Sequence, residues 1–436
     1  MFSKILIANR GEIAVRIIRA CKEMGIQAVA VYSTADADAL HVALADQSVC
    51  IGASEASDSY LNAERILSAA LVTGAQAIHP GYGFLSENAD FARMCEQNGV
   101  TFIGPPPELM SAVGDKARIK AMVAEAGLPV IPGSGILEDL QAARKAADQI
   151  GYPVMIKARS GGGGRGIRLV QSAAELENAF FAAQAEGEAA FGDGAVYMEQ
   201  YVSPARHVEV QLLADEAGSV VFLGERDCSI QSKNNQKLVE ETPSPAVSPA
   251  VRQRLMEASV AAAKAIRYVN VGTMEFLLDP KTGNFYFMEM NIRLQVEHTI
   301  TEQLTGIDLV KWQIRVTAGI PLGFTQEDVS FKGSSIECRI NALAPGKVTF
   351  LHVPGGPFVR FDTFLMNGMT VPPYYDSLLG KLVVFAATRE ETLRKLRSAL
   401  CELVIDGVPN NIEQQIDIVS SPAFTDGSYD LDFFKK

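Results

Sequence analysis

The sequence lacks the features of secreted, membrane-bound and nucleic-acid-binding proteins. Its six cysteines are scattered without a Cys-x-x-Cys pair, which is typical of reduced thiols and not of disulfides or a zinc site. No apolar run approaches the roughly 20 residues of a membrane-spanning helix, and the N-terminus has no signal-peptide pattern. The formal net charge is −12 without a basic cluster, which argues against nucleic acids and membrane surfaces as partners. We expect a folded cytoplasmic protein.

The length is too great for one ordinary hydrophobic core. A chain of 436 residues predicts two or three domains. Hydrophobic residues make up 48% and charged residues 21%, which is normal for a folded protein. The pattern along the chain predicts α/β and α+β architecture.

The first hundred residues alternate between strand and helix patterns, which predicts a doubly wound parallel sheet. Ligands of such sheets bind at the carboxyl ends of the strands, where segments 9–12 and 79–83 fall. The expected strands are 4–8, 27–32, 75–79 and 101–103, and the expected helices are 12–24, 60–73 and 91–98.

A Gly-Pro-Pro-Pro run at 104–107 predicts a boundary. Beyond it we expect a second region that starts with two helices and continues with antiparallel strands and helices. A third region, with mixed α+β pattern, begins near residue 334. The expected elements are helices 115–126, 139–150 and 389–404 and strands 154–158, 167–170, 273–278 and 335–340.

The segment 289–297 alternates strictly between polar and apolar residues, which predicts a strand with two unlike faces. One reading is an amphipathic strand with a solvated face. The polar set holds carboxylates, amides and a guanidinium, which bind metals and anions, so we interpret the segment as a catalytic wall. The polar face would carry Glu289, Asn291, Arg293, Gln295 and Glu297.

A straight strand would separate Glu289 and Glu297 by roughly 26 Å, so the strand predicts two adjoining stations. Metal and nucleotide would bind at Glu289, and a second substrate near Arg293 and Glu297. Glu275 shares a face with Glu289 only if an odd-length loop or a bulge sets the register. Such a pair of carboxylates beside Asn291 suits magnesium that carries nucleotide phosphates.

The glycine-rich segment 161–166 lies between two expected strands, so it matches neither the P-loop nor the dinucleotide fingerprint. Glycines let backbone amides approach phosphates, and a mobile loop can close over a nucleotide. Lys116 and Lys157 add charges that suit phosphates. The alternative is a flexible hairpin with two surface lysines.

Together these groups resemble the ATP-grasp superfamily: Lys116, Lys157, the glycine segment and the Glu275–Glu289–Asn291 set. Within it, the chain resembles biotin carboxylase. The motifs are the segments 8–14, 79–87, 206–211 and 295–298, followed by 371–377 and 405–408.

The resemblance implies a two-step reaction. ATP would activate bicarbonate as carboxyphosphate, and the carboxyl group would move to N1′ of biotin on a carrier protein. It also implies three domains: an N-terminal domain 1–113, an ATP-grasp domain 114–333 with a mobile lid at about 131–203, and a C-terminal domain 334–436.

The resemblance also assigns residues. Glu297 would deprotonate bicarbonate, Arg339 would stabilise the biotin enolate and Lys237 would steady carboxyphosphate. Bicarbonate and biotin would contact Arg293, Gln295, the Val296 amide, Arg339 and Tyr82. Glu275, Glu289 and Asn291 would bind two Mg²⁺ or Mn²⁺ ions. ATP would contact Lys116, Lys157, Gly162, Gly163, Gly164, Glu199, Val202, His207, Leu277 and Leu431.

The chemistry accounts for these residue types. Bicarbonate is a poor nucleophile until a carboxylate removes its proton. Arg293 can grip a planar oxyanion in bidentate fashion, and a guanidinium beside N1′ stabilises developing negative charge. Two segments depart from the family pattern: 232–237 is one residue longer and lacks a histidine, and the stretch after Asn341 is about ten residues shorter.

The chain lacks the Met-Lys-Met sequence of a biotin-accepting domain. We therefore expect a stand-alone subunit, with carrier protein and carboxyltransferase on other chains as in acetyl-CoA carboxylase, and a homodimer. One alternative is another ATP-grasp ligase that transfers an acyl phosphate to an amine. A second is a non-catalytic nucleotide-binding paralogue that docks to a carrier protein.

Overall fold

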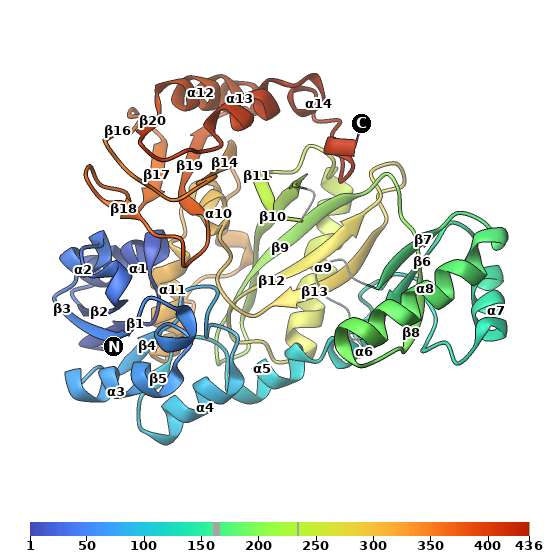
Figure 1. Ribbon diagram of the computed structural model, residues 1–436, viewed down its shortest axis with the longest axis horizontal. Coiled ribbons are helices and arrows are strands. Elements are labelled where there is room, and N and C mark those ends of the chain that lie inside the picture. The colour runs from blue at the N-terminus through green and yellow to red at the C-terminus, as the bar shows by residue number, and fades with distance from the viewer. Residues whose placement is uncertain (160–165, 233–234, 436) are drawn as a thin grey trace.

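The computed structural model describes residues 1–159, 166–232 and 235–435, apart from the side chains of Lys116, Ala117 and Phe191. An N-terminal unit, a large central sheet, a C-terminal layer and a separate small lobe are visible in Figure 1. No helix in this described part of the chain is long and apolar enough to cross a bilayer.

The N-terminal sheet is parallel in every pair, with strand order β3-β2-β1-β4-β5. Ile5 and Ile7 face one hydrophobic cluster and Leu6 faces another, so the central strand is buried on both sides. This confirms the predicted doubly wound sheet. Its strands are β1 (Lys4–Ile7), β2 (Gln27–Ser33), β3 (Gln47–Gly52), β4 (Ala77–His79) and β5 (Thr101–Phe102), joined by α1 (Gly11–Glu23), α2 (Leu40–Leu44), α3 (Ala63–Thr73) and α4 (Ala89–Gln97).

The proline run is followed by a helix that the sequence did not predict. Helix α5 (Pro107–Gly114) begins at the last of the three prolines. A proline at the first helical position has the backbone angle of a helix and needs no hydrogen-bond partner, so the run starts a helix there. Helix α6 (Lys116–Glu125) follows at the predicted place.

An antiparallel sheet forms the centre of the molecule, in the order β13-β12-β9-β10-β11-β14-β19-β17 (Figure 1). Because β11 pairs with β14, segments before and after the expected boundary at 333 share one sheet. Its strands are β9 (Arg206–Ala214), β10 (Val220–Gln231), β11 (Lys237–Thr242), β12 (Asn270–Leu278), β13 (Phe285–Asn291), β14 (Ser334–Asn341), β17 (Val359–Thr363) and β19 (Leu378–Ala386).

The small lobe has a three-stranded sheet, β7-β6-β8, and a core of its own around Ile156, Phe180 and Met198. Its strands β6 (Val154–Ala158) and β7 (Ile167–Val170) flank the glycine-rich segment, as predicted. The other elements are β8 (Val196–Gln200), α7 (Leu140–Ile150) and α8 (Ala173–Phe191).

Shorter elements and helices complete the described fold. They are α9 (Pro249–Ala265), α10 (His298–Thr305), α11 (Leu309–Thr317), α12 (Arg389–Glu402), α13 (Ile412–Ser420), α14 (Pro422–Thr425), β15 (Gly346–Lys347), β16 (Phe350–His352), β18 (Thr370–Val371) and β20 (Val404–Asp406).

The expected nine-residue strand 289–297 is wrong in its second half. Strand β13 ends at Asn291, residues 292–297 form an irregular turn, and α10 begins at His298. Ile292 and Leu294 join different hydrophobic clusters, so the chain must change direction between them. The solvated-face reading is excluded because Glu297 is fully buried.

We predict that Phe276→Ala destabilises the protein strongly. Phe276 is fully buried in β12, with ring centroids 5.6 Å from Phe285 and 6.3 Å from Phe287. The cavity should lower the free energy of unfolding in urea by about 3–5 kcal/mol. Phe350→Ala is the control, since this ring is half exposed and its loss should cost under about 1 kcal/mol. Equal losses for both variants would contradict the packing.

Candidate active site

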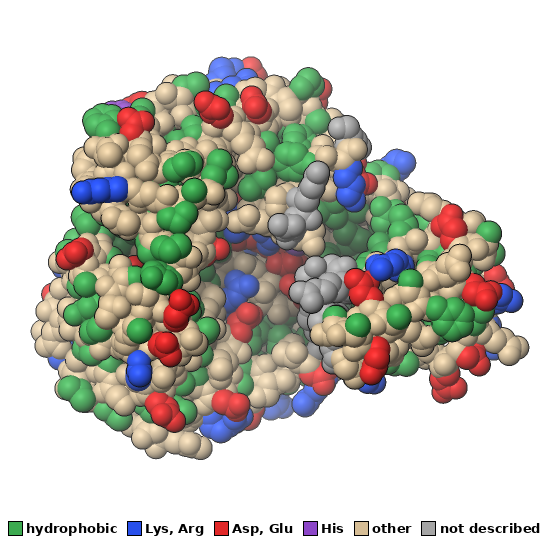
Figure 2. Space-filling view, in the orientation of Figure 1, with side chains coloured by type: hydrophobic (Ala, Val, Ile, Leu, Met, Phe, Trp, Pro, Cys, Tyr) green, Lys and Arg blue, Asp and Glu red, His purple; other side chains and the backbone are tan. Residues whose placement is uncertain are grey.

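A cavity of about 720 Å³ lies between the central sheet and the small lobe. The space-filling view shows a hollow there, with acidic and basic side chains inside it (Figure 2). Strands β6 and β8 of the lobe form one wall, and strands β9 to β13 form the floor.

One end of the cavity is apolar. It is lined by Ile131, Met155, Leu277, Met288 and Leu431, which together suit a flat ring system. Leu277 and Leu431 were predicted to contact ATP, as was Val202, which also lines the cavity. The other three apolar residues were not predicted, because a single apolar side chain within a strand pattern gives no chemical signal.

Glu199 of β8 links the lobe to the rest of the site. Its carboxylate accepts hydrogen bonds from Lys120 and Lys157, each at 2.6 Å. Burial raises the pKa of Glu199, but the two ammonium groups outweigh burial and the pKa is lowered. Lys157 lines the cavity, which argues against the alternative that it is an ordinary surface lysine. The side chain of Lys116 and the predicted phosphate contacts Gly162, Gly163 and Gly164 lie outside the described residues.

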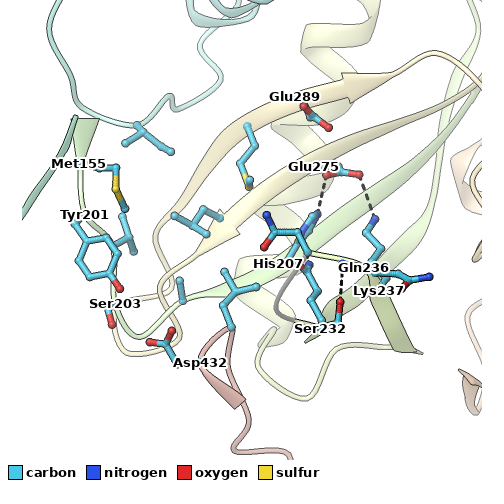
Figure 3. Close-up of a pocket in the computed structure, with 18 of the residues that line it drawn as sticks. Met155, Tyr201, Ser203, His207, Ser232, Gln236, Lys237, Glu275, Glu289 and Asp432 are labelled. Carbon is cyan, nitrogen blue, oxygen red and sulfur yellow. Dashed lines mark hydrogen bonds and ion pairs between the residues drawn. The ribbon is translucent and has the colours of Figure 1, made fainter. Parts of the chain in front are cut away.

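Three carboxylates form a row across neighbouring strands. Glu209 of β9 pairs in register with Glu275 of β12, which pairs with Glu289 of β13. A β-bulge next to Glu275 shifts the register by one residue, so the condition for placing Glu275 and Glu289 on one face is met. Figure 3 shows Glu289 on the strand beside Glu275.

Lys237 neutralises much of this charge. Its Nζ lies 2.8 Å from Glu209, 3.2 Å from Glu275 and 2.7 Å from Glu297. On the other side of Glu275, the His207 Nε2 lies 2.8 Å from the second carboxylate oxygen (Figure 3). Burial alone would lower the pKa of Lys237, but the three carboxylates raise it well above its usual value.

The same cations act on the carboxyl groups. Burial opposes ionisation of Glu275 and Glu297, yet Lys237 is the strongest of the cations that hold both pKa values well below the usual range. For Glu275 the second cation is His207, and for Glu297 it is Arg339. Both carboxyl groups are therefore ionised at neutral pH.

The turn after β13 brings the two expected stations together. Asn291 donates to Glu275 at 2.9 Å, and Arg293 donates to Asn291 at 3.1 Å and to Gln295 at 3.0 Å. The estimate of roughly 26 Å between Glu289 and Glu297 holds only for a straight strand. The strand ends at Asn291 and the chain bends, so that Lys237 contacts both Glu275 and Glu297. The stations are adjacent.

Arg339 of β14 closes the far side of the site. It donates to Glu240 at 2.6 Å and to Glu297 at 3.0 Å. Burial raises the pKa of Glu240 to about 7, against the opposing effect of Arg339. The guanidinium therefore lies between Glu297, whose pKa is lowered, and Glu240, whose pKa is raised.

A second cavity of about 540 Å³ lies next to the first one. Arg293, Val296 and Arg339 line both cavities, so the two spaces meet at these residues. Tyr82, predicted to contact biotin, lines the second cavity and donates a hydrogen bond to Glu12. Asn341, where the shortened segment begins, also lines it.

Several charged residues of the site were not predicted individually, among them Lys120, Glu209, Arg226 and Glu240. Glu209 belongs to the motif 206–211 but was given no role, although its place in an alternating strand beside Glu275 was readable. Arg226 is fully buried and donates to Glu209 at 2.5 Å, to Gln211 at 2.7 Å and to Thr301 at 2.9 Å. No pattern in the sequence signals this arginine.

The donor set fits a hard divalent cation. Glu275 and Glu289 face the same side, with the Asn291 amide beside them. Carboxylate and amide oxygens are the ligands that Mg²⁺ and Mn²⁺ prefer. In the described part of the chain, ligand atoms of His207, Glu209 and Glu275 also lie within 4.8 Å of one another.

We predict that Lys237→Met destabilises the protein by about 3–5 kcal/mol at pH 7, because it leaves buried carboxylates unpaired. In the wild type, the depressed pKa values of Glu275 and Glu297 stabilise the fold above the unfolded pKa of about 4.3, and this is lost as pH falls through the folded values. In the variant the buried carboxyl groups protonate at higher pH, so the deficit should narrow between pH 7 and pH 5.

Urea unfolding at several pH values measures this effect. Arg144→Met, which removes an exposed ion pair with Glu177, is the control and should change little at any pH. A deficit for Lys237→Met that stays constant with pH would contradict the predicted charge pairing.

Comparison with known proteins gives full-length matches. Residues 1–110 match "Biotin carboxylase, N-terminal domain", residues 115–325 match "Carbamoyl-phosphate synthase L chain, ATP binding domain", and residues 337–436 match "Biotin carboxylase C-terminal domain". Biotin carboxylase 1 of Bacillus subtilis is 49% identical over 444 residues, which cover 100% of this chain and 98% of that protein.

Solved structures of biotin carboxylases are also similar to this chain. A biotin carboxylase from Campylobacter jejuni, in a complex described as beta-gamma-ATP, is 46% identical with a TM-score of 0.93 and covers 100% of this chain and 99% of its own. The biotin carboxylase domain dimer of Hydrogenobacter thermophilus 2-oxoglutarate carboxylase, with MgADP, ADP and bicarbonate, is 48% identical with a TM-score of 0.91, covering 100% and 97%. The chain belongs to the biotin carboxylase family.

Proposed function

We propose that this protein carboxylates biotin at N1′ with ATP and bicarbonate, through carboxyphosphate. The observation that carries the proposal is the position of Glu297. This buried carboxylate contacts Lys237 and Arg339 and follows Val296 in the chain, and Val296 and Arg339 line both cavities. One cavity suits a nucleotide and the other suits an acceptor, so a carboxyl group formed at their junction has a short path to transfer.

The first cavity would hold ATP. Its apolar end would take adenine against Leu277 and Leu431, beside the segment from Glu199 to Val202. Lys157 and His207 line the same cavity and would meet phosphates or ribose. Lys116 and the segment 162–164 would complete the phosphate contacts, and the lobe at about 131–203 would act as a lid.

Magnesium or manganese would be held by Glu275, Glu289 and Asn291. Two such ions would neutralise phosphate charge during phosphoryl transfer. Lys237 and His207 both contact Glu275 and balance its charge. A bound metal ion would balance part of this charge instead, so that Lys237 would be able to contact carboxyphosphate.

Bicarbonate would lie against Arg293, Gln295 and the Val296 amide. Arg293 is oriented by its hydrogen bonds to Asn291 and Gln295, so little side-chain freedom is lost on binding. Glu297 would take the proton from bicarbonate. Movement of Lys237 away from Glu297 would raise the basicity of this carboxylate at the moment it is needed.

Biotin would enter the second cavity beside Tyr82. Arg339 would stabilise the negative charge that develops on its ureido oxygen when N1′ loses its proton. The guanidinium is held by Glu240 and Glu297, so it is oriented before the acceptor arrives.

The partners follow from the reaction. A biotin carboxyl carrier protein would bring biotin, and a carboxyltransferase subunit would use the product, as in acetyl-CoA carboxylase of fatty acid synthesis. We also propose a cytoplasmic homodimer with domains 1–113, 114–333 and 334–436. A dimer is seen for the biotin carboxylase domain of the H. thermophilus relative.

We predict that wild-type protein hydrolyses ATP in a bicarbonate-dependent reaction stimulated by free biotin, and that Glu297→Gln lowers biotin-dependent turnover by about 10²–10⁴-fold. An amide cannot accept the proton, while the affinity for ATP should change by no more than about twofold. Steady-state kinetics and ATP titration measure both. Glu413→Gln, an exposed glutamate on α13, is the matched control and should behave as wild type.

Two outcomes would favour the alternatives. ATP hydrolysis that depends on an amine acceptor would indicate another ATP-grasp ligase. Wild-type inactivity with its own carrier protein, with intact ATP binding, would indicate a non-catalytic paralogue.

We predict that Arg293→Lys raises the KM for bicarbonate by about tenfold, because lysine keeps the charge but loses the bidentate grip. The KM for ATP should stay nearly constant. Arg118→Lys on the exposed side of α6 is the control. An unchanged KM for bicarbonate in Arg293→Lys would place the bicarbonate site elsewhere.

A further inference from the structure

Lys381 is a buried cation that the proposed reaction does not use. Its side chain on β19 is fully buried and lines neither of the two cavities. It stands between Arg339 of β14 and Asp362 of β17 in the register of the sheet. Two cations on neighbouring strands repel each other, so burial of Lys381 next to Arg339 requires compensating contacts.

Those contacts join three distant parts of the chain. The Lys381 Nζ donates to the Val296 carbonyl at 2.9 Å and lies 3.1 Å from a carboxylate oxygen of Glu12 in α1. The same Glu12 carboxylate accepts the hydrogen bond from Tyr82, and the Tyr82 ring centroid lies 5.9 Å from the ammonium. One ammonium therefore contacts the turn before Glu297, helix α1 and the ring that lines the second cavity.

Charge balance alone does not explain this arrangement. Glu337, on the strand next to Lys381, is also fully buried, and burial raises its pKa well above the usual value. A lysine whose only task is to balance charge would direct its shortest hydrogen bond to a carboxylate, yet that bond goes to a backbone carbonyl. Replacing both partners of a buried ion pair with apolar residues is often neutral, so the pairing with Glu12 is weak evidence for a purely stabilising role.

The carbonyl in question belongs to the peptide between Val296 and Glu297. Holding this peptide plane restricts the turn that presents the Val296 amide on one side and the Glu297 carboxylate on the other. A lysine donor to a carbonyl in a dry site is a strong directional contact. Without it, residues 295–297 keep the contacts of Gln295 and Glu297 but lose the bond that fixes the peptide plane between Val296 and Glu297.

We propose that Lys381 is a positioning residue that orients the turn 295–297 for bicarbonate and, through Glu12, orients Tyr82 for the acceptor. This inference rests on the proposed function. Strand β19, in the C-terminal part of the chain, would then help to form the bicarbonate site.

The test is Lys381→Met, which keeps the length of the side chain and removes the donor. We expect the KM for bicarbonate to rise by about tenfold or more, while the KM for ATP stays within about twofold of wild type. A purely structural defect would lower kcat by reducing the active fraction and would leave both KM values unchanged. Arg389→Met, which leaves the buried Glu241 without its guanidinium partner, is the control for such a defect.

A second variant separates positioning from charge balance. Lys381→Met with Glu12→Gln removes both charges of the buried pair but does not restore the donor. A raised KM for bicarbonate in this double variant supports the proposal, and a return to the wild-type value overturns it. Failure of both variants to fold, seen by circular dichroism, would show that the role is structural and would also overturn it.

Wild-type kinetics distinguish this proposal from the proposed function. If wild-type protein shows no bicarbonate-dependent ATP hydrolysis, the proposed function fails and the inference falls with it. If the wild type is active and Lys381→Met keeps the wild-type KM for bicarbonate, only the inference is overturned.

Discussion

The structure of the site depends on one contact: the Lys237 ammonium among the carboxylates of Glu209, Glu275 and Glu297. Carboxylates at such distances in a dry interior cannot all remain ionised without cations between them. Arg226 shares this task through its ion pair with Glu209, and Arg339 through its ion pair with Glu297. The protein's own cations thus balance these carboxylates. In the proposed function, substrates and metal ions would bind by exchange, because each new charge would replace a contact made by Lys237 or Arg339.

The register of the central sheet makes this contact possible. The regular register of β9 and β12 aligns Glu209 with Glu275, and the bulge beside Glu275 aligns Glu289 with them on the same face. The end of β13 then turns the chain so that Glu297 returns to the same ammonium. A straight continuation of β13 would have carried Glu297 away along the sheet. The bulge and the turn are both departures from regular strand structure, and the chemistry of the site depends on them.

Much of this could be predicted from the sequence where local patterns carry the information. Alternating strand and helix patterns predicted the parallel sheet, and the two strands around the glycine-rich segment appear at the expected residues. The alternation at 289–297 predicted polar residues of which Glu289, Asn291, Arg293 and Gln295 line the first cavity, but it predicted the wrong backbone, since periodicity does not show whether both faces are buried. Arg226 and Lys381 were not predicted because their partners are distant in sequence; Lys381 and Val296 are 85 positions apart. Such contacts arise only when the sheet brings its strands together.

The continuity of the sheet across residue 333 has a consequence for carboxyl transfer. Arg339 and Lys381 belong to strands that follow the expected boundary, whereas Lys237 belongs to the strand before it. Because β11 and β14 are hydrogen-bonded neighbours, these cations are held by one rigid layer and not by two units that slide past each other. A short-lived activated carboxylate must be transferred before water reaches it, which requires the acceptor pocket and the activating site to keep a constant separation. The shared walls of the two cavities at Arg293, Val296 and Arg339 supply that constancy, and in the proposed function the lobe on the other side of the first cavity would be the part that moves.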